Sequence, residues 1–73
     1  MTKALHTDAY GRFQERLKEA RKQAKLTQIQ VAEKLGLPQS YVSKIESGER
    51  RVDAVELEKL ARIYGRSVNY FLK

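Results

Sequence analysis

The first stretch of the chain carries apolar residues at helical spacing. From Tyr10 onward they recur every three or four positions, which places them on one face of an α-helix. These positions are Tyr10, Phe13, Leu17, Ala20 and Ala24. Thr7 and Asp8 stand just before this face, and both residue types cap helix N-termini. The pattern predicts an amphipathic helix from about Asp8 to Lys25.

Two capping boxes predict where further helices begin. In Thr27-x-x-Gln30 and in Asp53-x-x-Glu56, the first side chain can accept from a backbone N–H of the first turn while the last side chain reaches back. A third start is expected near Pro38, because proline lacks an N–H that the first helical turn would leave unpaired anyway.

Glycines predict where these helices end. Gly36, Gly48 and Gly65 each follow a segment with helical periodicity, and glycine readily takes the left-handed conformation that closes a helix. Ser67 then caps a short last helix. After the first helix, the expected inward-facing residues are Val31, Ala32, Leu35, Val42, Ile45, Ala54, Leu57, Leu60, Ala61, Tyr64, Val68 and Phe71. No stretch alternates as a strand would, so the expected fold class is all-α with five short helices.

Composition narrows the class of protein. With 73 residues, of which 41% are hydrophobic, the chain can form one small domain with a single core. It has no cysteine and a single histidine, His6, so we expect no catalytic residues, no metal site and no cofactor. The longest apolar run is Tyr70-Phe71-Leu72, and the N-terminus does not resemble a secretory signal. We therefore expect no membrane association and a cytoplasmic protein, nucleoid-associated if it is bacterial.

The charge balance favours an anionic partner. Fifteen lysines and arginines stand against nine aspartates and glutamates, which gives a net charge of +6. A nucleic acid would be attracted to such a domain, although a basic surface can also serve only to keep a small protein soluble.

The link between the second and third expected helices is very short. Only Gly36-Leu37-Pro38 separates them, and so short a link forces the steep crossing of a helix-turn-helix unit. Ala32 is small where the two helices approach, and Leu37, Val42 and Ile45 are expected to fill the angle between them. On spacing alone, an ordinary helical hairpin remains the alternative.

At this point the chain resembles a known family. The segment TQIQVAEKLGLPQSYVSKIESGERRVDAVELEKLARIYG is similar to the Cro/C1-type (XRE) family of phage-repressor-like helix-turn-helix domains, with the likeness extending over roughly Phe13 to Leu72. The resemblance implies a compact five-helix lambda-repressor-like domain, here residues 9–73 behind a flexible N-terminal arm of residues 1–8. It also implies a transcriptional regulator, with repression the expected role, that binds double-stranded DNA at a palindromic operator as a homodimer.

The resemblance assigns DNA contacts residue by residue. The exposed face of the family's recognition helix corresponds to Gln39, Ser40, Ser43 and Lys44, which are expected to read bases. Expected phosphate contacts are Gln28, Tyr41, Arg50 and Arg51. Tyr41 is expected to be partly buried with its hydroxyl toward DNA, although stacking on the backbone is an alternative. The family often has proline at the position of Val52, so the path of the preceding loop is open here.

Two further groups of residues follow from the same resemblance. Arg21 and Glu46 match a structural ion pair that ties the first helix to the end of the third. Ile63, Tyr70 and Leu72 are apolar, are expected to lie off the core face, and fall in the region where the family forms its dimer contact. Scattered apolar residues on a surface are also common, so this surface is equally compatible with no partner.

A second class of function stays open. The same fold can serve as a protein-interaction adaptor or coactivator, and such a protein should present an apolar strip where the recognition helix faces outward. The polar and cationic residues expected at that face favour DNA.

Overall fold

The structure, a computed structural model, describes residues 8–73 and consists of helices joined by short links. The helices are α1 Asp8–Gln23, α2 Gln28–Leu35, α3 Gln39–Ser47, α4 Ala54–Tyr64 and α5 Val68–Leu72. The all-α prediction with five helices is therefore confirmed for the described part of the chain. The expected arm of residues 1–8, with its His6 and the candidate cap Thr7, lies outside the described residues except for Asp8.

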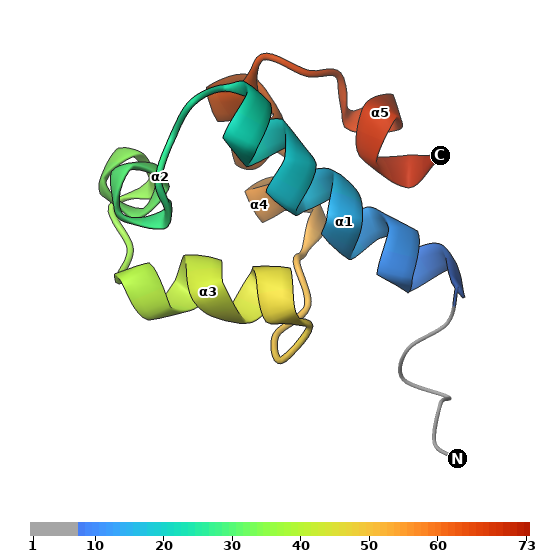
Figure 1. The fold of residues 1–73 in the computed structure, drawn as a ribbon, viewed down its shortest axis with the longest axis horizontal. Coiled ribbons are helices and arrows are strands. Elements are labelled where there is room, and N and C mark those ends of the chain that lie inside the picture. Colours follow the sequence, from blue (N-terminus) through green and yellow to red (C-terminus); the bar gives the residue numbers. More distant parts are fainter. Residues whose placement is uncertain (1–7) are drawn as a thin grey trace.

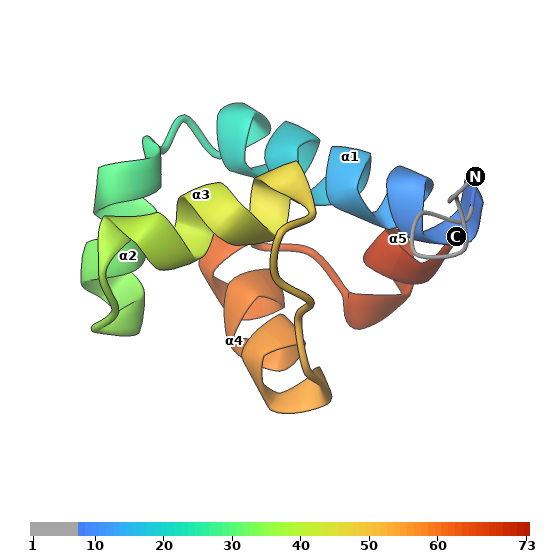
Figure 2. The ribbon, with the colours of Figure 1, turned by 90° about the horizontal axis from the view of Figure 1, so that it is seen from below.

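The helices enclose one core. α1 crosses the molecule with α5 on one side and α3 on the other, and α2 stands at the far end of α3 (Figure 1). In the view from below, α3 runs between α1 and α4, and the α3–α4 loop descends from its C-terminal end (Figure 2). The largest fully buried side chains come from all five helices: Leu17, Val31, Val42, Ile45, Leu60 and Phe71.

Both predicted capping boxes are present. The Thr27 hydroxyl accepts from the Gln30 N–H at 3.1 Å while the Gln30 side chain accepts from the Thr27 N–H at 2.8 Å. Asp53 and Glu56 repeat this exchange at the start of α4. Each box gives side-chain acceptors to two backbone N–H groups that would otherwise lack a partner at a helix start, which fixes both starts.

The first helix ends two residues earlier than its periodicity predicts. Lys25 takes a left-handed backbone with φ of 62°, which ends the helix without a glycine. The Lys25 N–H donates to the Lys22 carbonyl at 3.0 Å, and the Leu26 N–H donates to the Arg21 carbonyl at 3.2 Å. The apolar spacing up to Ala24 could not show this turn, because Ala24 still packs against the core.

Three further local expectations were wrong in whole or in part. Leu37 lies beyond the turn at Gly36 and is 40% exposed, so Val31, Val42 and Ile45 fill the angle between α2 and α3 without it. Ala54 is exposed because it is the first residue of α4, and Val52 packs against the core just before it. Ser67 occupies the cap position of α5, but its side chain makes no capping hydrogen bond.

Candidate nucleic-acid interface

One face of α3 is polar and open while the other is buried. Tyr41, Val42, Ile45 and Glu46 point into the fold, so the helix has one fixed orientation. The side chains on the opposite face are exposed, and they include all four expected base-reading residues: Gln39, Ser40, Ser43 and Lys44. These positions are spaced by one, three and four along a helix, so they form one continuous stripe.

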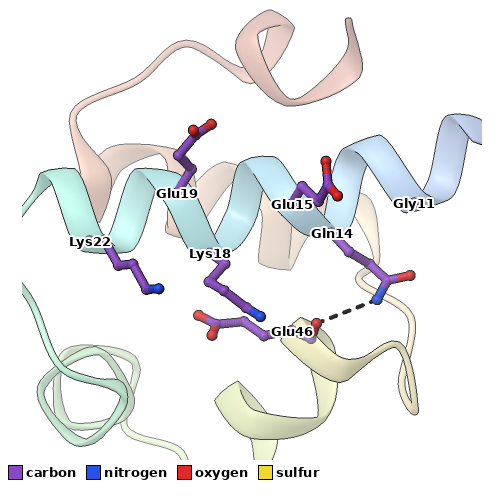
Figure 3. Close-up of a pocket in the computed structure, with 7 residues that line it drawn as sticks. All are labelled: Gly11, Gln14, Glu15, Lys18, Glu19, Lys22 and Glu46. Atoms are coloured by element: carbon purple, nitrogen blue, oxygen red, sulfur yellow. Dashed lines mark hydrogen bonds between the residues drawn. The ribbon is translucent and has the colours of Figure 1, made fainter.

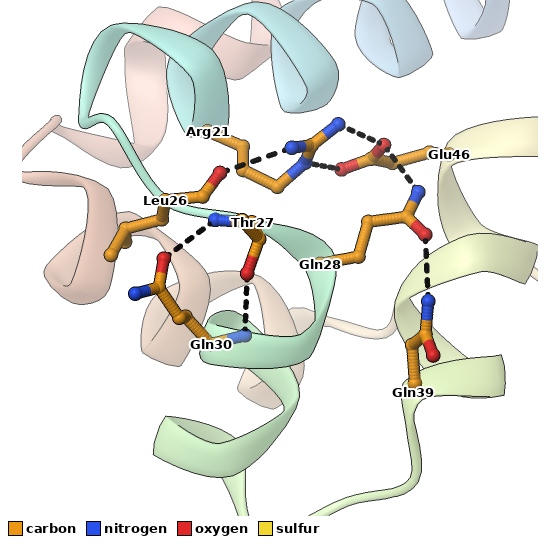
Figure 4. Close-up of polar contacts among 7 residues, drawn as sticks. All are labelled: Arg21, Leu26, Thr27, Gln28, Gln30, Gln39 and Glu46. Carbon is orange, nitrogen blue, oxygen red and sulfur yellow. Dashed lines mark hydrogen bonds and ion pairs between the residues drawn. The ribbon is translucent and has the colours of Figure 1, made fainter.

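A buried ion pair sets the angle of this helix against α1. Arg21 donates to both carboxylate oxygens of Glu46, from Nε at 2.7 Å and from Nη2 at 3.1 Å (Figure 4). The side chains are only 13% and 2% exposed, so the pair is largely shielded from water. Its hydrogen bond to Glu46 raises the pKa of Arg21, which therefore keeps its charge.

The same arginine also reaches the link between α1 and α2. Its Nη1 donates to the carbonyl of Leu26 at 3.0 Å, directly before the Thr27 cap (Figure 4). One guanidinium thus connects the end of α1, the start of α2 and the end of α3. Both helices of the helix-turn-helix unit are held to α1 by this one side chain.

Two glutamines extend this network toward the open face of α3. The Gln28 amide donates to Glu46 Oε1 at 3.0 Å, and its oxygen accepts from Gln39 Nε2 at 3.5 Å (Figure 4). Gln39 is exposed and Gln28 is half-buried. The expected phosphate-contacting glutamine and the expected base-reading glutamine are therefore neighbours joined to the buried ion pair.

The C-terminal end of α3 is fixed to α1 through its backbone. Gln14 Nε2 donates to the Glu46 carbonyl at 3.4 Å, beside a shallow groove that Lys18 and Lys22 also line (Figure 3). Gly48 follows with φ of 88°, and a Cβ there would lie 2.8 Å from the Gln14 amide nitrogen. The left-handed backbone favours glycine at this turn, and a Cβ would also require the end of the flexible Gln14 side chain to shift.

The loop after α3 is held by Arg50. Its N–H donates to the Lys44 carbonyl at 3.2 Å, and its guanidinium donates to both oxygens of Glu56 at 3.0 and 3.2 Å. The guanidinium also lies over the Tyr41 ring, with Cζ 4.8 Å from the ring centroid. Hydrogen bonding from Arg50 lowers the pKa of Glu56, so the carboxylate is ionised at neutral pH. Arg50 thus connects the loop to both α3 and α4.

The position of Tyr41 differs from the expectation. The residue is 7% exposed and its hydroxyl oxygen is buried, so that oxygen has no open surface to present to a phosphate. Burial, and then the nearby Glu56 carboxylate, raise the pKa of Tyr41. The ring packs against the core and against the Arg50 guanidinium, so Tyr41 is buried as expected or more so, but its hydroxyl does not face outward as expected.

Arg51 lies next to the start of α1. Its guanidinium carbon is 4.3 Å from the centroid of the Tyr10 ring, and Tyr10 in turn packs on Phe13 at 5.2 Å between ring centroids. Both expected phosphate-contacting arginines are thus stacked on tyrosines from other parts of the fold.

The residues expected at a dimer contact are not equally open. Leu72 is 64% exposed, whereas Ile63 and Tyr70 are half-buried and pack against the core. Tyr70 is held between Arg16 and Arg66, whose guanidinium carbons are 5.3 and 4.6 Å from its ring centroid. The expectation that Ile63 and Tyr70 lie off the core face was therefore wrong in part, because both rest on it by one side.

Sequence reasoning missed the contacts that join these residues. The hydrogen bond from Gln28 to Glu46, the pairing of Arg50 with Glu56 and the tyrosine–arginine stacks all join positions that no local pattern relates. Glu56 was already assigned to the capping box, so no sequence pattern indicated that it also pairs with Arg50.

The described residues contain no group of three or more histidines, cysteines, aspartates or glutamates placed to hold a metal ion. Within the same part of the chain, no helix is both long and apolar enough to cross a membrane.

Comparison with known proteins agrees with this geometry. A family model described as a helix-turn-helix matches residues 17–71. Two curated relatives from Bacillus subtilis (strain 168) are similar: the uncharacterized HTH-type transcriptional regulator YqaE, 41% identical over 84% of this chain and 53% of its own, and the HTH-type transcriptional regulator ImmR, 42% identical over 78% and 45%. The chain spans about half the length of these relatives.

A solved structure extends the match to nearly the whole fold. The XRE-family like protein from Pseudomonas syringae pv. tomato str. DC3000 superposes with a TM-score of 0.84 at 41% sequence identity, covering 97% of this chain and 87% of that one. This chain therefore belongs to the XRE family of helix-turn-helix proteins.

Proposed function

We propose that this protein is a sequence-specific DNA-binding transcriptional regulator that reads the major groove with the exposed face of α3. One observation carries the proposal: a stripe of four polar side chains on a short helix whose opposite face is buried and whose angle is set by the Arg21–Glu46 pair. An α-helix fits the major groove, and these side-chain types match the base edges displayed there. The curated relatives named as transcriptional regulators support the same role.

Each side chain on the stripe has a definite chemistry toward DNA. The Gln39 amide can accept from and donate to adenine, and the Lys44 ammonium can donate to guanine. Ser40 and Ser43 can donate to either a base or a phosphate. An apolar strip suited to a protein partner is not what this face of α3 presents, which favours DNA over an adaptor role.

Gln28 supports both reading and anchoring in this proposal. One N–H of its amide is used by Glu46 and its oxygen accepts from Gln39, which leaves the second N–H for a phosphate. Gln28 then orients the base-reading Gln39 while it contacts the DNA backbone. Removal of Gln28 should therefore weaken binding to every sequence and also relax discrimination by Gln39.

The remaining proposals concern assembly and regulation. We propose that two copies bind a palindromic operator, with Leu72 at the centre of their contact and Ile63 and Tyr70 beside it. Their recognition helices would then lie about 34 Å apart, one turn of B-DNA. A dimer bound at such an operator would block the promoter beside it. The protein would then act as a repressor in the cytoplasm.

Selection of bound sequences from random duplex DNA tests the proposal. The wild type should enrich one motif with two-fold symmetry, and sedimentation should show two chains on it. Gln39→Ala should lose about 1–3 kcal/mol of binding at one base pair of that motif and little elsewhere. A matched exposed change away from α3, Val55→Ala, should enrich the wild-type motif. Failure of the wild type to enrich any motif would refute sequence-specific reading.

A further inference from the structure

The two arginines that follow α3 are both stacked, but on rings from different helices. Arg50 lies on Tyr41 of α3, and Arg51 lies on Tyr10 in the first turns of α1. Planar guanidinium groups stack well on aromatic faces, and their N–H groups lie at the edge of the plane, away from the ring. The loop between α3 and α4 is thus bracketed by aromatic rings on two sides.

The two arginines join the loop to different parts of the fold. Arg50 donates to both oxygens of Glu56, so its charge is matched within the fold and its contacts close the loop onto α4. Arg51 instead connects the loop to α1, on a ring that is half-buried and packed against buried Phe13. Packing against the core therefore holds the Tyr10 ring in one position.

Holding an arginine side chain in place before it contacts a phosphate should strengthen that contact. A free arginine side chain samples many rotamers, and binding must freeze it in one of them at a cost in entropy. A guanidinium already held on a ring has lost part of that freedom before DNA arrives. The gain should appear in affinity, without any change in the number of charges that contact the DNA.

We propose that Tyr10 is a positioning residue for DNA binding, holding the Arg51 guanidinium in place to meet the DNA backbone. This inference rests on the proposed DNA-binding function, and it gives Tyr10 a role that needs no DNA contact of its own. The first turns of α1 thereby contribute to DNA binding through the loop after α3.

A double-mutant cycle tests the proposal, with labelled duplex DNA of random sequence as the probe. Tyr10→Leu removes the ring, and Arg51→Lys keeps the charge but removes the planar group. Each single change should weaken binding by about two- to fivefold, which is the worth of an exposed cation–π contact. The dependence of affinity on salt should be unchanged in both, because the charge remains. The double variant should bind no more weakly than Arg51→Lys alone.

Losses that multiply in the double variant would overturn the proposal, because Tyr10 would then act through the fold and not through Arg51. Wild-type affinity in Arg51→Lys would overturn it too, even if Tyr10→Leu did not fold. Tyr10→Phe keeps the ring and should bind as the wild type does. Arg62→Lys, at an arginine paired with Glu58 on α4, is the matched control and should change nothing. A wild type that binds no duplex at all would instead refute the proposed function.

Discussion

Loss of the Glu46 carboxylate should cost this domain much of its stability. In Glu46→Ala, Arg21 loses both charge-assisted bonds, and its side chain is only 13% exposed, so water cannot fully replace them. Removing one partner of a buried pair typically costs about 3–5 kcal/mol, because the other charge is left buried. Since Arg21 keeps its bond to the Leu26 carbonyl and a little exposure, we expect about 3 kcal/mol, the lower end of that range.

This loss is large against the stability of so small a domain. At about 0.05–0.15 kcal/mol per residue, 73 residues have roughly 4–11 kcal/mol in total. Urea unfolding followed by circular dichroism would measure the change in the free energy of unfolding. Glu58→Ala is the matched control, because the side chains of Arg62 and Glu58 are 78% and 60% exposed and their pair should be worth less than about 1 kcal/mol. Equal losses in the two variants would refute the reasoning that the Arg21–Glu46 pair is a buried support.

Three further predictions follow from the same contacts. Tyr64→Phe should leave the free energy of unfolding unchanged or raise it by up to about 1 kcal/mol, because the buried hydroxyl has no hydrogen-bond partner among the described residues; a clear loss in urea unfolding would contradict this. Because folding lowers the pKa of Glu56, its contribution is present at neutral pH and is lost as the pH falls below about 4; Glu56→Gln should therefore lose stability at pH 7 and little at pH 3 in the same assay. Arg51→Ala should reduce the salt dependence of DNA affinity by about one unit per chain, because a cation that meets a phosphate is removed; a slope equal to that of the wild type would show that Arg51 meets no phosphate.

The helix starts and most helix ends were predictable because their causes are local. The Thr27 box and the Asp53 box each involve residues only three positions apart. The glycines that end helices adopt the left-handed conformation because they have no side chain that opposes it. The end of α1 was missed because Lys25 adopts that conformation without being a glycine. A lysine in that state is uncommon, so no sequence rule would select it.

The candidate site was predictable as a set of positions but not as a set of contacts. The resemblance placed Gln28 and Gln39 in separate roles, whereas the fold brings their amides together across 11 positions of sequence. The stack of Arg51 on Tyr10 spans the chain from the first helix to the loop after the third. Such pairings depend on how the helices pack, and the hydrophobic pattern fixes which faces meet without fixing which side chains touch.

The central claim is that the exposed face of α3 is the surface that binds DNA. Amide chemical-shift mapping of the labelled protein with the selected duplex tests it most directly. The account predicts that the largest shifts fall on α3 from Gln39 to Lys44, on Gln28 and on the loop at Arg50 and Arg51, with the α4 positions near Arg62 unchanged. Largest shifts on α4 or α5, with the exposed face of α3 unmoved, would contradict the account.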